Sequence, residues 1–513
     1  QEAAELARPL SSWLAEAIEA IEAEQGPARI LRDHLAWLER YLRVHLRRHE
    51  GPMESHPLLE RAGEALLEHL TNLGENDQGR LSADLQRLVA AAPAGSQLLG
   101  YGSYAAIHLA ILAIRARAVS RRSALRNRVA DSIRGLRELL SVEWAKSDHA
   151  IEPRMLLDSI GPGGDRFDPG ALSGIMDHAR GTREISEPRR TRIERALSVL
   201  EAWHPDPVLL HCVHTKALSN CALDEHMAVE AELHQDPCAR AMEIFDRQAA
   251  RQAEIFSALR IAQLEIKGIY DPVIHDPWFA NFGWEAFSQE ELLLVPTVMA
   301  LESADRLAGS DLRPFSRLLS SGRPVQVLVR VQAHNNPGCD DREDPFATYR
   351  IELGYLGIAH RQAVVAQSSG GRHDHLLQGD LAALDATRTG LHIINTGLRP
   401  ESKLMPLNAW LVAGAAIESR AHPFFRINPA AGDAAALRMN FDRNPQPEAD
   451  WPIHPVRYQD ENGNLADREL AVTFADYALL IERLRHHFRL IPAGCDSDSL
   501  VPIQDYLSIG QEE

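Results

Sequence analysis

Residues 318–329 read LLSSGRPVQVLV, and the chain continues as RVQAHNNPGC to residue 339. The first part predicts the end of a helix, broken at Gly322, and the second predicts a β-branched strand that enters a loop of Asn, Pro and Gly. An uninterrupted apolar run between helical segments is typical of a strand buried on both faces of a parallel sheet. Ligands bind beyond the carboxyl ends of such strands, so the loop HNNPGCDDRED (334–344) is the best candidate for a functional site.

Three similar runs flank this strand in the second half of the chain. They are LLLVPTVMA (292–300), QAVVAQS (362–368) and LHIINT (391–396), and helical segments at 310–321, 344–361 and 373–386 alternate with them. This alternation predicts an α/β domain over residues 277–513, with a mainly parallel sheet, helices on both faces and PVQVLVRV (324–331) as a central strand.

The first 150 residues have a different pattern. In ILRDHLAWLERYLRVHLRRHE (30–50), Leu31, Leu35, Leu38 and Leu42 form one apolar stripe with charged residues opposite, which predicts an amphipathic helix. We therefore expect residues 1–150 to form a large all-helical domain that contributes no catalytic groups. Residues 151–276 are expected to be a mixed, mostly helical linker region with a long helix over 238–266.

Composition limits the function classes. The chain has 513 residues with 45% hydrophobic and 25% charged side chains, typical of a folded multidomain protein. Its net charge of -18 argues against nucleic-acid binding. Five cysteines without a short-spaced framework favour a reducing, cytoplasmic location, and the most apolar segment (104–114) is too short to span a membrane. The chain begins with Gln, which suggests processing or excision from a longer polypeptide, and we expect a homo-oligomer.

The order of elements in residues 295–395 resembles the thiamine-diphosphate-binding domain of the pyruvate:ferredoxin (2-oxoacid:acceptor) oxidoreductase family. In that family a helix ends in a Leu-Ala-Ser-Gly type sequence, and a Val-Leu-Val strand then runs into Ser-Asn-Thr-Gly. LLSSGRPVQVLV is similar to the helix end and the strand, and Asn336-Pro337-Gly338 falls on Asn-Thr-Gly. The resemblance implies thiamine diphosphate and Mg²⁺ as cofactors, with a 2-oxoacid substrate and a ferredoxin-like acceptor as partners, beside other domains or subunits of an oxidoreductase.

The resemblance also implies a set of site residues. The family holds Mg²⁺ through the Asp of a Gly-Asp-Gly motif and the Asn of the later loop, because Mg²⁺ prefers oxygen ligands. At the place of Gly-Asp-Gly this chain has LESADRLAG (301–309), where the glycines are missing. Asp305 and Asn336 are thus the expected metal ligands, Gly338 completes the expected cofactor site, and Glu302 is a second candidate carboxylate.

Other candidate metal sites are weaker. The family's Cys-x-x-Cys pair does not occur, so we expect no iron–sulfur cluster within this chain. The segment HCVH (211–214), with Cys221, His226 and His234 downstream, offers ligands for Zn²⁺, or histidines that only cap and pack. In GRHDHLL (371–377), Asp374 between two histidines predicts an N-cap at a helix start, where an anion could also bind.

Two functional hypotheses follow. The first is a thiamine-diphosphate-type module for oxidative decarboxylation of a 2-oxoacid, with catalytic residues that the sequence does not identify. The second is a non-catalytic, degenerate module that serves as a docking or dimerisation scaffold, which the missing Gly-Asp-Gly and Cys-x-x-Cys motifs favour.

Overall fold

The computed structural model describes residues 2–488, except 48, 50, 179–184, 217, 219–220, 222, 224–227, 334–350, 398–405, 445–450, 452, 460–464, 481–484 and 486–487. By its internal contacts the chain divides into two compact units. The first contains Gln1–Ala116, Val208–Glu243 and Thr297–Glu513, and the second contains Arg117–Pro207 and Ile244–Pro296.

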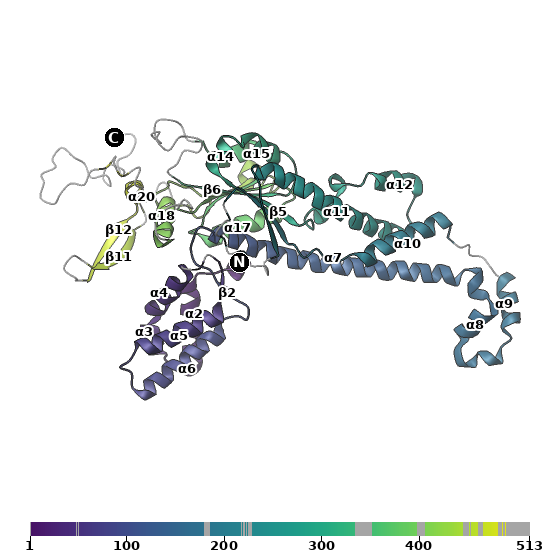
Figure 1. Ribbon diagram of the computed structural model, residues 1–513, viewed down its shortest axis with the longest axis horizontal. Coiled ribbons are helices and arrows are strands. Elements are labelled where there is room, and N and C mark those ends of the chain that lie inside the picture. Colours follow the sequence, from purple (N-terminus) through teal and green to yellow (C-terminus); the bar gives the residue numbers. More distant parts are fainter. Residues whose placement is uncertain are drawn as a thin grey trace. The chain divides into compact units, whose positions relative to one another are not determined.

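The first unit contains an eight-stranded sheet in the order β10-β9-β7-β8-β6-β5-β3-β4. Figure 1 labels two of its interior strands, β5 and β6. Six of its strands are parallel: β3 (Leu210–His214), β4 (Val229–Leu233), β5 (Thr297–Ser303), β6 (Gln326–Val331), β7 (Val364–Ser369) and β8 (Gly390–Asn395). The strand β9 (Phe425–Ile427) is antiparallel to β7, and β10 (Met439–Asn440) is antiparallel to β9. The predicted mainly parallel α/β sheet is confirmed, with PVQVLVRV as an interior strand between β8 and β5.

The sheet begins earlier in the chain than residue 277. Its strands β3 and β4 come from the segment that the sequence predicts as a mostly helical linker, and β3 pairs with β5 in parallel register from Leu210↔Thr297 to His214↔Leu301. The boundary expected at residue 277 therefore divides strands that belong to one sheet. A separate antiparallel pair, β11 (Ile453–Gln459) and β12 (Leu465–Ala471), follows the sheet before α20 (Phe474–Leu480).

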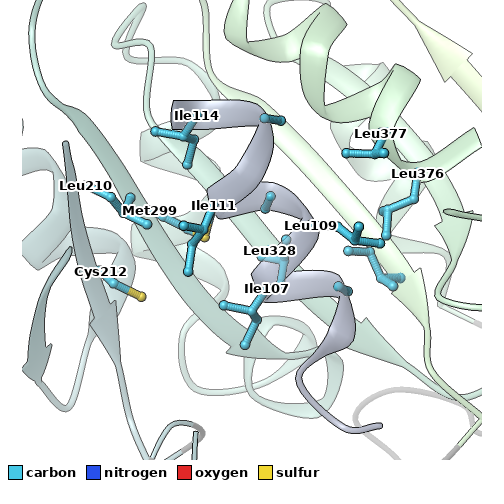
Figure 2. Packing of buried hydrophobic residues seen from close by; sticks show 14 of the residues in the cluster. Ile107, Leu109, Ile111, Ile114, Leu210, Cys212, Met299, Leu328, Leu376 and Leu377 are labelled. Atoms are coloured by element: carbon cyan, nitrogen blue, oxygen red, sulfur yellow. The ribbon is translucent and has the colours of Figure 1, made fainter. Parts of the chain in front are cut away.

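Strand alternation gives the sheet two buried faces. Leu210, Met299 and Leu328 lie on one face, where the first part of α7 (Ala105–Ala145) and α17 (His373–Leu384) cover them. Figure 2 shows Ile107, Ile111 and Ile114 of α7 directed toward these strand residues, with Leu376 and Leu377 of α17 beside them. We call this side the α7 face.

On the other side of the sheet, α16 (Leu353–Ala359) packs against β7 and β8. A Cβ atom on Gly357 would lie 2.6 Å from Leu391 Cδ2, so the helix backbone approaches the strands closely. Contacts also join α16 to α14 (Ala304–Ala308), which packs on β5 and neighbours α15 (Leu312–Leu319). We call this side the α16 face, and with it the prediction of helices on both faces is confirmed.

Residues before α7 form a small helical body. Its helices are α2 (Leu10–Gln25), α3 (Arg29–Asp33), α4 (Leu35–Arg47), α5 (Ser55–His69) and α6 (Glu75–Ala91), whereas the preceding α1 (Glu2–Leu6) contacts α17 and its Ala3 is buried in the core of the α7 face. Leu31, Leu38 and Leu42 of the predicted stripe are fully buried in its core and Leu35 packs against it, although the helix breaks at His34. The short strands β1 (Met53–Glu54) and β2 (Gln97–Leu98) pair in this body, so it is not entirely helical.

Within the described residues, the second unit consists of helices and the loops between them. Beyond the remainder of α7 these helices are α8 (Pro153–Ile160), α9 (Pro169–His178), α10 (Glu187–Ala202), α11 (Pro237–Ile266, shared with the first unit), α12 (Pro272–Ala280) and α13 (Gln289–Leu292). The predicted long helix over 238–266 is confirmed as α11. The helices of the described ranges include none long and apolar enough to cross a membrane.

Candidate functional site

The carboxyl edge of the parallel strands contains a topological switch point. After β3 the chain adds β4 on one side, whereas after β5 it adds β6 on the other side. Connections that leave neighbouring strands in opposite directions open a crevice between the strand ends, and ligands of α/β proteins bind at such positions. In this sheet the position where such a crevice is expected lies beyond His214 of β3 and Ser303 of β5.

The structure describes only some of the residues that the sequence predicts for this site. Asp305 lies in the first turn of α14 and is exposed. Asn336 and Gly338 lie outside the described residues. The juxtaposition of Asp305 with Asn336 therefore stays a prediction, and Glu302 is the buried carboxylate at the end of β5.

The Glu302 side chain is fully excluded from solvent on the α16 face. Neither carboxylate oxygen accepts a hydrogen bond within the described residues, and Arg306 Nε lies 3.4 Å from Oε2. Burial raises the pKa of Glu302 to about 7; Arg306 opposes this rise, and Asp311 adds to it. A carboxyl group with a pKa near neutrality is suited to general acid–base chemistry.

The neighbours of Glu302 hold its ion-pair partner in place. Arg306 also pairs with the Asp311 carboxylate and donates to the backbone carbonyl of Gln235. Because Arg306 shares its charge with Asp311, it offsets only part of the cost of ionising Glu302.

Cys238, at the start of α11, is fully buried, and burial raises the pKa of its thiol well above the usual range.

The HCVH segment does not assemble a zinc site from the residues that the structure describes. It forms β3, where alternation places His211 and Cys212 on opposite faces: His211 Nδ1 lies 3.1 Å from Glu230 Oε2, and Cys212 is in the core of the α7 face (Figure 2). Cys221 Sγ lies 3.7 Å from His108 Nε2. His226 is outside the described residues, and the described ones include no group of three or more His, Cys, Asp or Glu placed to hold a metal ion.

The segment GRHDHLL begins α17, but its acidic residue is not the cap. The N-cap position is Arg372, without a side-chain cap hydrogen bond, and Asp374 Oδ2 instead lies 3.1 Å from Arg443 Nη2. His375 points into the protein, where Nδ1 and Ser368 Oγ share a hydrogen bond of 2.9 Å and the ring stacks on Phe424. Burial lowers the pKa of His375 to about 4, with a further lowering by Arg426, so this histidine is a neutral core residue at physiological pH.

Sequence reasoning missed two polar residues at the carboxyl edge. Arg330 is the one charged residue of β6, and Asn395 is the last residue of β8. The available signal was a cationic side chain inside an otherwise apolar interior strand, because a charge in such a place is costly to bury. Comparison of the chain with protein-family models and with curated proteins gives no match.

Proposed function

We propose that the α/β unit is a thiamine-diphosphate-type module that acts on a 2-oxoacid, within an oxidoreductase that passes electrons to a ferredoxin-like acceptor. The observation that carries this proposal is Glu302, a buried carboxyl with a pKa of about 7 at the switch point of a mainly parallel sheet. The similarity of residues 295–395 to the family domain supports the choice of cofactor.

In this proposal one residue of the chain transfers protons and others bind the cofactor. Glu302 holds and releases a proton at its carboxylate, since both of its protonation states are populated near neutral pH. Asp305 and Asn336 supply oxygen ligands for Mg²⁺, and Gly338 allows close backbone approach to a diphosphate. Thiamine diphosphate, when bound, supplies the electron sink for cleavage beside the 2-oxo group.

A thermal-shift experiment tests the proposal on the full chain. Mg²⁺ with thiamine diphosphate should raise the melting temperature of the wild type, because a ligand that binds only the folded state stabilises it. Asn336→Ala and Asp305→Asn should abolish this rise, and Asp433→Asn, at an exposed carboxylate elsewhere in the same unit, should keep it. A wild type that does not respond to the cofactor pair would overturn the proposal.

One observation favours the scaffold alternative. In α12, Val273, Ile274 and Trp278 expose 84%, 64% and 41% of their surface, and apolar groups gathered on one exposed helix are typical of contact surfaces. If the chain is a docking or dimerisation body, replacing Val273 and Ile274 by serine should lower its molar mass in light scattering. Unchanged mass, combined with a thermal shift from the cofactor, would exclude this alternative as the main function.

A further inference from the structure

The helix α12 exposes an apolar face to solvent in the second unit. At about 3.6 residues per turn, one side of this helix carries Val273, Ile274, Pro277, Trp278 and Ala280. All five are exposed. A soluble protein seldom gathers apolar side chains on one outer surface unless another molecule covers them. We call these five residues the α12 surface.

The opposite side of α12 already packs against the second unit. Phe279 stacks on Tyr270, with ring centroids 6.2 Å apart, and His275 contacts the same ring. The Arg192 guanidinium lies 3.9 Å from the centroid of the Tyr270 ring, and Arg192 also pairs with the buried Glu265. These contacts fix which side of the helix faces inward, so the α12 surface is held toward solvent.

Trp278 is fixed at one edge of the α12 surface. The Arg260 guanidinium lies 5.2 Å from the centroid of its ring and 5.1 Å from that of Phe282, and the buried Glu291 pairs with the same guanidinium. The indole therefore rests on a fixed cation while part of it stays exposed. A large aromatic side chain that is fixed before binding loses little conformational entropy on association, and such residues often dominate the binding free energy.

Carboxylates flank the α12 surface. Asp271 is the N-cap residue of the helix, Asp276 lies on the helix beside Val273 and Ala280, and both are exposed. Each accepts a hydrogen bond that fixes its position, Asp271 from Val273 N and Asp276 from Tyr270 Oη. The sequence from 268 to 291 contains five Asp or Glu residues and no Lys or Arg, so the surroundings of the α12 surface are acidic.

We propose that the α12 surface binds an amphipathic helix of a partner protein, in which aliphatic side chains lie beside Lys or Arg residues. The apolar side chains of the partner cover Val273, Ile274 and Trp278, and its basic residues face Asp271 and Asp276. A second copy of this chain fits less well, because an isologous contact brings the α12 carboxylates of both copies together. The same carboxylates repel anionic lipid headgroups and nucleic acids.

Fluorescence anisotropy with two labelled peptides tests the proposal on the full chain. One is an amphipathic helical peptide of Leu and Lys, and the other has the same pattern with Glu in place of Lys. The wild type should bind the Leu–Lys peptide more tightly, and Val273→Ser with Ile274→Ser should weaken this binding roughly 10- to 100-fold, because the central apolar contact is lost. Ile175→Ser with Met176→Ser, at exposed apolar residues of α9 in the same unit, is the matched control and should bind like the wild type.

Asp271→Asn with Asp276→Asn tests the charge separately from the apolar contact. Asparagine keeps an acceptor for Val273 N and for Tyr270 Oη, so the helix retains its cap and its contact. Binding of the Leu–Lys peptide should fall roughly 10-fold and lose most of its salt dependence. Asp131→Asn with Glu138→Gln, at exposed positions of α7 in the same unit, should bind like the wild type.

Equal binding of the two peptides, no binding by the wild type, or wild-type-like binding by the Val273→Ser, Ile274→Ser variant would overturn the proposal. A lower molar mass of that variant in light scattering would assign the α12 surface to a second copy of the chain, and loss of binding to phosphatidylcholine–phosphatidylserine vesicles would assign it to a membrane. Either result would also overturn the proposal. The test uses neither thiamine diphosphate nor Mg²⁺, so a missing cofactor response rejects the proposed function and leaves this inference unchanged.

Discussion

His392 Nδ1 lies 3.1 Å from Asp380 Oδ1, between β8 and α17, where both side chains are almost fully excluded from solvent. On its other side, His392 Nε2 lies 2.9 Å from Gln326 Oε1 of β6. The imidazole thus joins a helix carboxylate to a neighbouring strand in the middle of the α7 face. The His392 and Asp380 side chains are close enough for an ion pair, although their geometry does not form a hydrogen bond.

Asp380→Ala should therefore destabilise the protein, with a coupling free energy to His392 of about 0.5–3 kcal/mol, the range for side chains in contact. Replacing both residues, as in Asp380→Leu with His392→Phe, should cost less than the sum of the single changes, because no unpaired group remains. Urea unfolding of the wild type, the two single variants and the double variant gives the coupling free energy. Additive effects would show that the two side chains do not stabilise each other.

Glu302 predicts a loss of stability as the pH rises. Its folded pKa of about 7 is above the ordinary value of 4.5, so the folded state favours the protonated form. The cost of ionisation is absent below about pH 4.5 and complete above about pH 7, and it reaches on the order of 3 kcal/mol. Glu302→Gln should therefore gain stability relative to the wild type between pH 5 and pH 8 in urea unfolding. Asp433→Asn should follow the wild-type profile, and a Glu302→Gln difference that does not change with pH would contradict the prediction.

His375 predicts the opposite dependence. Its folded pKa of about 4 is below the ordinary 6.5, so protonation opposes folding. The stability that depends on the neutral ring is complete above pH 6.5 and decreases as the pH falls toward 4, by on the order of 3 kcal/mol in total. His375→Gln should be less stable than the wild type at pH 7, with a difference that shrinks toward pH 4. His204→Gln, at an exposed histidine, is the control, and parallel curves for His375→Gln and wild type would refute the assignment.

Replacing each of two helical glycines by alanine should change the stability of the protein in opposite directions. A Cβ atom on Gly357 would lie 2.6 Å from Leu391 Cδ2 and 3.0 Å from Val365 Cγ2, both in the core, so Gly357→Ala should destabilise by about 1–3 kcal/mol through overpacking. Gly79 in α6 has nothing within 4 Å of its Cβ position, so Gly79→Ala should stabilise by about 0.5–1 kcal/mol through helix propensity. Thermal unfolding measures both, and equal signs would show that packing against β8 does not limit residue 357.

The interior strands were predictable because burial on both faces demands an apolar run. That signal identifies β6, β7 and β8 directly. It misplaces the start of β5: the leucines at 292–294 precede the strand because Ser288 and Glu291 form a capping box that begins α13, and β5 starts only at Thr297 after Pro296. The edge strand β4, with Glu230 and Glu232, lacks such a run, and so its place in the sheet could not be read from the pattern.

The candidate site was predictable only in part, for a related reason. Glu302 lies in the segment that matches the family's Gly-Asp-Gly motif, so the resemblance predicts it as a candidate carboxylate. Arg330 and Asn395 belong to different strands, and their unsatisfied donors become visible only once β6 and β8 are neighbours. Register between distant segments is a property of the folded sheet, and no local pattern encodes it.

The pairing of β3 with β5 has a consequence for how the protein folds. Leu210 can meet Thr297 only after the chain that separates them, which includes β4 and the whole of α11, has been gathered into a closed loop. Closing a long loop costs entropy before the contacts compensate for it, so pairing of this kind is slow. Helices such as α11 form locally within microseconds and shorten the segment that must be closed. We therefore expect β3 to join the sheet late in refolding, after β6, β7 and β8 have paired, with the Glu302 crevice among the last parts of the molecule to close.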